Sequence, residues 1–244
     1  MRYLLCDPFY RTQKTLTDKK MERICTWYNI GYSPGFPKQL SYQIKFKAIY
    51  LSTMSSALIT HMERFVHIPA DQQLVISSFF KSHTYKKKEM LLKQGEICRS
   101  NYFVVKGCLR MYFITEKGVE HTMQFALENW WLTDLLAFNL QKTTEFYIQA
   151  VEATEVMCID YNSLEQLYDQ VPLTEKYFRL IYQKAAGASQ QKAKYFQDFS
   201  KEELYHQFNS SFPEFIQRVP QYLIASYLGF TPEYLSEIRK KNLS

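Results

Sequence analysis

Gln221-Tyr-Leu-Ile-Ala-Ser-Tyr-Leu-Gly-Phe-Thr-Pro-Glu-Tyr-Leu-Ser-Glu-Ile-Arg-Lys-Lys241 is the stretch that says most about this 244-residue chain. A helix-turn-helix needs a small residue where its two helices approach each other, and Ala225 has that place. It also needs a residue that tolerates a positive φ at the turn, and Gly229 follows four positions later. The apolar residues that can wedge the two helices together recur at helical spacing: Ile224, Leu228, Leu235 and Ile238. The stretch therefore predicts a helix-turn-helix.

The second helix of this pair has a clear predicted start. Thr231 can cap it, and Pro232 takes its first position. Glu233 lies in the first turn, where a negative charge interacts favourably with the helix dipole. If this helix enters the major groove of double-stranded DNA, the candidates for contacts with bases and phosphates are Thr231, Glu233, Tyr234, Ser236, Glu237, Arg239, Lys240 and Lys241. The alternative is a helical hairpin that touches no DNA, because Ala and Gly occur at such places in many helix pairs.

Residues 161–168, further upstream, follow the 3.6-residue period of a short helix, and residues 173–199 follow that of one long helix. The residues along one side of it are Tyr177, Leu180, Ile181, Lys184, Ala188, Tyr195 and Phe199. Gly187 lowers helix propensity but permits the close approach of a partner backbone. Ser200 and Glu203 have the spacing of a capping box, which opens a predicted helix-turn-helix domain over residues 200–244.

The period of the apolar residues changes to two between residues 84 and 160. Short strands with single glycines between them are typical of an antiparallel barrel or jelly roll, and a short amphipathic helix over residues 69–80 precedes them. We assign Gly95, Gly107 and Gly118 to turns that need a positive φ. The predicted fold class is α+β: an antiparallel β-roll domain over residues 61–172, the long helix over residues 173–199, and an all-α helix-turn-helix domain.

The net charge of +6 belongs to the N-terminal segment. Residues 1–53 contain nine Lys and Arg against three Asp and Glu, whereas the rest of the chain has 21 of each sign and is neutral. The basic composition therefore gives no support to DNA binding by the folded body. We expect residues 1–60 to be a basic extension that is poorly ordered, and the alternative is a genuine basic arm.

Several segments of the sequence carry a family resemblance. They are Leu92-Lys-Gln-Gly-Glu, Tyr102-Phe-Val-Val-Lys-Gly, Glu128-Asn-Trp-Trp, Ile148-Gln-Ala-Val-Glu-Ala-Thr-Glu-Val and the stretch from Pro220 to Lys241. Through them, residues 65–241 resemble the Crp/Fnr superfamily of transcription regulators, particularly the short-tailed members found in many Bacteroidetes. The resemblance implies a sensor domain with a β-roll of the cyclic-nucleotide-binding type, and a dimerisation helix over residues 173–199. It also implies a cytoplasmic homodimer that binds palindromic sites in double-stranded DNA, with RNA polymerase as a further partner.

Relatives that bind cyclic nucleotides carry a phosphate-binding cassette with a Gly-Glu pair and an Arg-Ser pair, and this chain departs from it. The Arg-Ser positions fall on Thr144 and Glu145, and the Gly-Glu positions fall near Thr133 and Asp134. A phosphate would meet a carboxylate in place of an arginine, so we expect no binding of cAMP or cGMP. An unknown small-molecule effector and a regulator without a ligand are equally admissible. The candidate lining of a pocket in the β-roll is Trp131, Asp134, Thr144, Glu145 and Phe146, although such aromatic residues also suit a plain core.

Other kinds of chemistry lack the residue patterns that they need. The five cysteines form no Cys-x-x-Cys pair, which is typical of reduced thiols in a cytoplasmic protein. The five histidines form no His-x-His or His-x-x-x-His pair, and no run of 18 apolar residues exists. We therefore expect no catalytic residues, no metal, no cofactor and no membrane span. The alternative function is a ligand- or partner-binding β-roll protein with a vestigial helix-turn-helix that does not bind DNA.

Overall fold

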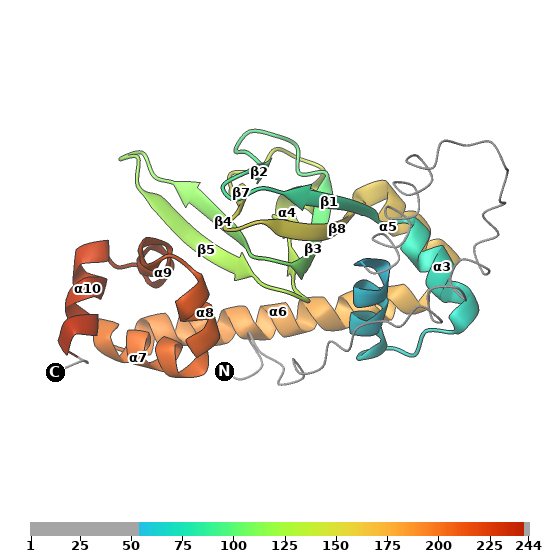
Figure 1. The fold of residues 1–244 in the computed structure, drawn as a ribbon. Coiled ribbons are helices and arrows are strands. Elements are labelled where there is room, and N and C mark those ends of the chain that lie inside the picture. The colour runs from blue at the N-terminus through green and yellow to red at the C-terminus, as the bar shows by residue number, and fades with distance from the viewer. Residues whose placement is uncertain (1–53, 242–244) are drawn as a thin grey trace, which may run out of the picture.

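The computed structural model describes residues 54–241, so the expectations for residues 1–53 lie outside the described residues. Two four-stranded antiparallel sheets form the centre of the fold (Figure 1). The first sheet has the order β1-β8-β3-β6, with the strands Lys81–Tyr85, Thr154–Asp160, Ser100–Lys106 and Trp131–Leu132. The second has the order β2-β7-β4-β5, with the strands Met90–Leu92, Tyr147–Ala150, Leu109–Ile114 and Glu120–Ala126. Eight strands in two antiparallel sheets match the predicted jelly-roll class.

The glycines between the strands have the backbone conformation that the sequence predicted. Gly95, Gly107 and Gly118 have φ values of 86°, 104° and 77°. Gly107 is also the most closely packed, because a Cβ atom there would lie 2.6 Å from Oγ1 of Thr154 and 2.7 Å from the carbonyl oxygen of Ala153. The tight link between β3 and β4 therefore needs glycine both for its conformation and for its missing side chain.

A helix over residues 54–63 covers the core of the β-roll and corrects the expected limit of the N-terminal extension. Met54, Leu58 and Met62 are at most 1% exposed and belong to the same apolar cluster as the strands. Their spacing of four residues makes one apolar stripe on a helix. The prediction that the poorly ordered extension reaches residue 60 is therefore wrong for residues 54–60.

Helix α3 (Ala70–Ser78) confirms the helix expected over residues 69–80, but it is less two-sided than the sequence suggested. Ile76 is fully buried, whereas Leu74 is 56% exposed and Val75 is 37% exposed. Two adjacent apolar residues cannot both share the face of Ile76, since neighbouring positions on a helix point about 100° apart.

Two further helices flank the second half of the β-roll. The sequence predicted α5 (Tyr161–Gln170), whose first turn is capped by Asp160, because its carboxylate accepts a 2.9 Å hydrogen bond from the N–H of Ser163. It did not predict α4 (Leu135–Leu140), a helix of six residues in the break between β6 and β7.

Helix α6 (Leu173–Asp198) confirms the predicted long helix and runs beneath the two sheets (Figure 1). The C-terminal helices, named so hereafter, gather at its far end: α7 (Lys201–Ser211), α8 (Pro213–Arg218), α9 (Gln221–Leu228) and α10 (Pro232–Lys241). The predicted capping box is present at the start of α7. Oγ of Ser200 accepts from the N–H of Glu203 at 3.3 Å, and the Glu203 carboxylate accepts from the N–H of Ser200 at 2.8 Å. The short helix α8 was not predicted.

A buried chain of hydrogen bonds ties the helix over residues 54–63 to the β-roll and α6. Nε1 of Trp131 donates to the hydroxyl of Tyr177 at 2.8 Å, and this hydroxyl lies 2.8 Å from Nδ1 of His61. Because the hydroxyl oxygen accepts from Trp131, its proton is free to point at an unprotonated Nδ1. Burial, together with the positive charges of Arg64 and Lys184, lowers the pKa of His61 to about 3, so the imidazole is neutral and fits this role.

Candidate functional site

Helices α9 and α10 form the helix pair that the sequence predicted. Gly229 ends α9 in the left-handed conformation with a φ of 73°, and the N–H of Phe230 donates to the carbonyl of Ala225 at 2.8 Å. The four wedging side chains are all at most 3% exposed: Ile224, Leu228, Leu235 and Ile238. Ala225 is fully buried, so a larger side chain would push the helices apart.

The start of α10 also follows the prediction. Oγ1 of Thr231 accepts a 3.2 Å hydrogen bond from the N–H of Tyr234, and Pro232 is the first helical residue. Two chemical signals in the sequence, the cap and the proline, are enough to fix this helix end because both act through local backbone geometry.

Most of the residues proposed for DNA contacts lie on the exposed side of α10. The exposed members are Thr231, Glu233, Ser236, Glu237, Arg239 and Lys240. Tyr234 is half-buried, because its ring packs edge-on against Phe230 with the centroids 5.6 Å apart. Nζ of Lys201 from α7 lies 5.3 Å from the centre of the Tyr234 ring. The structure therefore brings the exposed members together on one face of α10, and Lys241 is the last residue of the helix.

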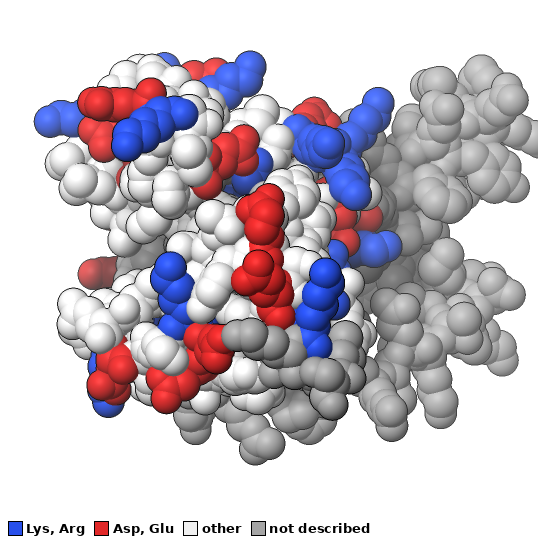
Figure 2. All heavy atoms as spheres, turned by 90° about the vertical axis from the view of Figure 1, so that its left-hand side faces the viewer, with Lys and Arg blue, Asp and Glu red and all other residues white. Residues whose placement is uncertain are grey.

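The charge on this face is mixed. Figure 2 shows Lys and Arg side chains intermingled with Asp and Glu over the end of the molecule that carries the C-terminal helices. On α10 itself, the negative charges of Glu233 and Glu237 balance the positive charges of Arg239 and Lys240. No extended basic surface is visible among the described residues in this view, which agrees with the neutral charge of residues 54–244.

Helix α9 is attached to β5, the edge strand of the second sheet, by a polar contact. The N–H of Thr122 donates to Oγ of Ser226 at 2.9 Å, and the Ser226 hydroxyl donates to the carbonyl of Glu120 at 2.8 Å. A side chain of the first helix of the pair thus satisfies backbone groups of an otherwise open strand edge. The helix pair is therefore held against the β-roll of its own chain.

Arg218 at the end of α8 makes a second attachment. Its Nε lies 2.7 Å from Oε1 of Glu152, and its Nη1 lies 2.9 Å from Oε2 of Glu128. Glu128 in turn accepts from the N–H of Gly107 at 2.8 Å. Burial favours a raised pKa for Glu128, but the hydrogen bonds from Arg218 and Gly107 outweigh it and lower the pKa. The Glu128 carboxylate is therefore ionised at neutral pH, and we call the contact of Arg218 with Glu128 and Glu152 the clamp.

Sequence patterns did not mark Ser226 and Arg218 as residues that join the C-terminal helices to the β-roll. They also did not mark Lys192 of α6, which contacts β5 and α9 nearby. Their partners lie 66 to 106 residues away along the chain. No local spacing could have marked them, because only the folded topology brings the two parts together.

The residues proposed for a pocket in the β-roll are placed differently from one another. Oγ1 of Thr144 donates to Oδ2 of Asp134 at 2.7 Å, and Oδ1 of Asp134 caps α4 by accepting from the N–H of Ala137 at 3.2 Å. Both side chains are buried, whereas Glu145 is exposed and Phe146 is half-buried. The candidates Asp134 and Thr144 do meet, but their hydrogen bonds satisfy each other and the N-terminus of α4.

Trp131 is part of the packed interior. Its indole is 8% exposed and lies 5.3 Å from the ring of Phe103 and 5.0 Å from that of Phe178, measured between centroids. Its N–H is used by Tyr177. The structure thus fits the core interpretation of this tryptophan rather than a pocket lining.

Residues 54–241 contain neither a cluster of metal ligands nor a cysteine with a lowered pKa. Within that range, no three His, Cys, Asp or Glu side chains gather in a way that could hold a metal ion. Cys98, Cys108 and Cys158 are buried, and burial raises the pKa of each thiol, which disfavours the reactive thiolate. Among the described helices, none combines the length and apolar character that crossing a membrane requires.

Comparison with known proteins gives one domain match and several relatives. Residues 82–171 match the cyclic nucleotide-binding domain family. The cAMP-activated global transcriptional regulator CRP of Salmonella typhimurium is 28% identical over 90 residues, and CRP of Escherichia coli O157:H7 matches to the same extent. This alignment covers 37% of the present chain and 43% of the relatives, so the chain matches less than half of their length.

Solved structures extend the likeness over more of the fold. FixK2 from Bradyrhizobium japonicum has a TM-score of 0.53 and 18% identity, over 66% of this chain and 83% of that one. The c-di-GMP-responsive global regulator CLP from Xanthomonas campestris has a TM-score of 0.57 and 16% identity, over 72% of this chain and 92% of that one. At such identities the likeness is one of fold.

Proposed function

Because residues 82–171 match the cyclic nucleotide-binding domain and the chain has the fold of Crp/Fnr regulators, we propose that this protein is a transcription regulator that binds double-stranded DNA through α10. The observation that carries the proposal is the geometry of α9 and α10. A tight left-handed turn at Gly229, a capped start at Thr231 and a polar exposed face make α10 a helix that can enter the major groove.

We propose that the active species is a homodimer paired through α6. In the middle of this helix, residues 183–187 are exposed and include the small residues Ala185, Ala186 and Gly187. Small residues let two helix backbones approach closely, and a two-fold axis there would pair each position with its own copy. Two copies of α10 would then read two half-sites about one DNA turn, roughly 34 Å, apart. Palindromic operators follow from this symmetry.

The mixed charge of α10 leads to a specific expectation for its affinity for DNA. Arg239, Lys240 and Lys241 supply the phosphate contacts, while Glu237 can accept from the amino group of cytosine but repels phosphate. We expect modest affinity that falls steeply with salt concentration, since phosphate contacts release counterions. A flat dependence of the dissociation constant on salt would contradict this claim.

The effector in this proposal is not cAMP. Where the nucleotide phosphate would need a cation, the described structure has the bonded pair of Asp134 and Thr144 with the exposed Glu145 beside it. A phosphate brought there would meet carboxylates and lose its water without compensation. Calorimetry should show no cAMP binding at about micromolar affinity, and binding of that strength would refute the claim.

The decisive experiment is selection of genomic DNA by the full-length protein. Enrichment of a palindromic sequence supports the regulator, and the double variant Arg239→Ala/Lys240→Ala should lose it. Lys93→Ala/Lys142→Ala is a matched control, because both of these lysines are exposed on the β-roll and removal of their charge should leave DNA binding intact. Equal loss in both double variants would indicate a nonspecific charge effect and contradict the assignment of α10.

A second candidate function is a ligand- or partner-binding β-roll protein whose helix pair no longer meets DNA. The acidic residues of α10 and the attachment of α9 to β5 favour it. If no DNA is enriched and the protein is an intact dimer, this second function replaces the first. For the regulator, a cytoplasmic location and contact with RNA polymerase are part of the proposal, and in vitro transcription from a selected site tests the polymerase contact.

A further inference from the structure

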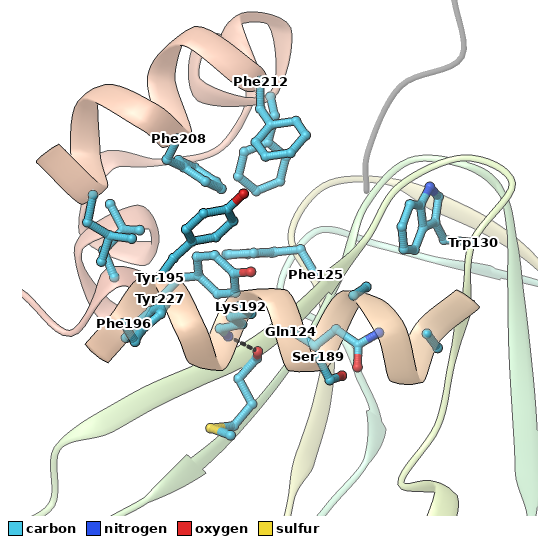
Figure 3. Close-up of a pocket in the computed structure, with 16 residues that line it drawn as sticks. Gln124, Phe125, Trp130, Ser189, Lys192, Tyr195, Phe196, Phe208, Phe212 and Tyr227 are labelled. Carbon is cyan, nitrogen blue, oxygen red and sulfur yellow. Dashed lines mark hydrogen bonds between the residues drawn. The ribbon is translucent and has the colours of Figure 1, made fainter. Parts of the chain in front are cut away.

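A cavity of about 150 Å³ lies where β5, the second half of α6 and the C-terminal helices meet, and we name it the junction cavity. Figure 3 shows that most of the labelled side chains around it are aromatic. They come from all three parts of the structure: Phe125 and Trp130 from the β-roll, Tyr195 and Phe196 from α6, Phe208 and Tyr227 from the C-terminal helices, and Phe212 from between α7 and α8. An engineered apolar cavity of about this volume is large enough for a benzene ring.

One cation lies among these rings. Nζ of Lys192 is 3.9 Å from the centre of the Tyr227 ring and donates a 2.7 Å hydrogen bond to the carbonyl oxygen of Met123 (Figure 3). Burial lowers the pKa of Lys192 to about 8, so the ammonium remains the main form at neutral pH. Within residues 54–241, no carboxylate forms an ion pair with it. The junction cavity therefore contains a half-buried positive charge that has no carboxylate partner among the described residues.

Among the described residues, the Lys192 ammonium lacks a full set of hydrogen-bond acceptors and a compensating negative charge. It has three N–H donors, of which the carbonyl of Met123 uses one. Removing a charge from water is costly unless an opposite charge compensates it, and a ring face compensates only part. A monoanion would supply the missing charge, and its apolar part would be received by the aromatic walls. A phosphate dianion would suit the site less, because a single lysine would leave one of its charges uncompensated.

We propose that the junction cavity binds a small aromatic carboxylate of about the size of phenylacetate, with the carboxylate on Lys192 and the ring among Phe125, Phe208 and Tyr227. This site is separate from the cassette of the β-roll, which contains Asp134 and Thr144. The regulatory consequence rests on the proposed DNA-binding function. Because the walls come from the β-roll, α6 and the C-terminal helices, an occupant would bias how the helix pair is held on the sheet.

Titration of the full-length protein with phenylacetate by calorimetry tests the binding. We expect a dissociation constant of about 1 mM or tighter and binding at least about tenfold weaker for the neutral analogue 2-phenylethanol. The cationic analogue 2-phenylethylamine should not bind. Equal affinity for the acid and the alcohol, or no binding of phenylacetate, would overturn the proposal.

Two variants locate the site. Lys192→Met should abolish phenylacetate binding, while Lys194→Met, which removes an exposed charge on the same helix, should leave it unchanged. Ala188→Phe keeps the lysine and fills the cavity from α6, so it should also abolish binding. Circular dichroism shows whether each variant is folded. A folded Ala188→Phe protein that binds phenylacetate like the wild type would overturn the location.

The consequence for DNA is measured separately. On a selected DNA site, saturating phenylacetate should change the dissociation constant by at least about threefold in the wild type and not in Lys192→Met. An unchanged constant in the wild type would refute the coupling. If the chain binds no DNA at all, the proposed function fails, while the calorimetric titration still decides whether the junction cavity is a ligand site.

Discussion

Replacement of Arg218 by alanine tests whether the C-terminal helices are fastened to the β-roll as the structure shows. The guanidinium forms hydrogen bonds with two carboxylates, those of Glu128 and Glu152. Breaking a buried pair by removing one partner costs about 3–5 kcal/mol. The side chain of Arg218 is 33% exposed and that of Glu128 is 14% exposed, so water screens part of the interaction. We expect Arg218→Ala to lower the free energy of unfolding by about 2–3 kcal/mol.

The assay is urea unfolding of the full-length protein, followed by tryptophan fluorescence and circular dichroism. Glu152→Gln is the milder comparison, because this carboxylate is 32% exposed and forms only one side of the clamp, so about 0.5–1 kcal/mol is expected. Limited proteolysis should cut the Arg218→Ala protein sooner between α6 and α7, since the C-terminal helices detach more often.

The pH dependence gives an independent check on the same clamp. The pKa of Glu128 is lowered in the folded protein, so its contribution is complete above the unfolded pKa and is lost as the pH falls through the folded pKa. The difference in stability between the wild type and Arg218→Ala should therefore shrink at acidic pH. A loss below about 0.5 kcal/mol at pH 7, or a difference that stays constant down to pH 3, would refute the reasoning.

Three further predictions follow from the geometry. Gly107→Ala should destabilise the β-roll by about 1–3 kcal/mol, because the new Cβ would lie within 2.7 Å of Thr154 and Ala153 at a φ of 104°. Thermal unfolding measures the loss of stability, and an unchanged midpoint would contradict the prediction. Because the pKa of His61 is lowered in the folded protein, the unfolded chain binds a proton at His61 first as the pH falls. The free energy of unfolding of the wild type should therefore fall by up to about 1.4 kcal/mol per pH unit below pH 6.5. His61→Gln should lack this part of the pH dependence, and an equal pH dependence in both proteins would exclude His61 as its source. Glu237→Arg should tighten DNA binding and steepen its salt dependence by about one phosphate contact per protomer, and unchanged binding would mean that α10 does not meet DNA.

Local chemistry explains which parts of the fold could be predicted from the sequence. The cap at Thr231, the capping box at Ser200 and the positive φ of Gly229 each depend on residues within four positions, so their sequence signals correspond directly to the observed geometry. The strands were predicted from a period of two that burial between two sheets requires. The helix over residues 54–63 was missed although its apolar residues recur every four positions.

The parts of the site that depend on long-range contacts could not be predicted. In the sequence, Lys192 is an ordinary polar position on an amphipathic helix. Only in the folded structure do β5 and α9 contact its side chain. Asp134 and Thr144 were candidates for a pocket lining, but the aspartate caps the N-terminus of the short helix α4, and the threonine hydroxyl donates to its carboxylate. In both cases the side chain's partner was set by topology rather than by neighbouring sequence.

The measurement that tests the central claim most directly is sedimentation of the full-length protein with a duplex that carries the selected palindromic site. The account predicts a complex of two chains per duplex, which disappears in Arg239→Ala/Lys240→Ala while the free protein remains a dimer. A dimer that binds the palindrome no better than a duplex of scrambled sequence, or a double variant that binds as tightly as the wild type, would contradict the account.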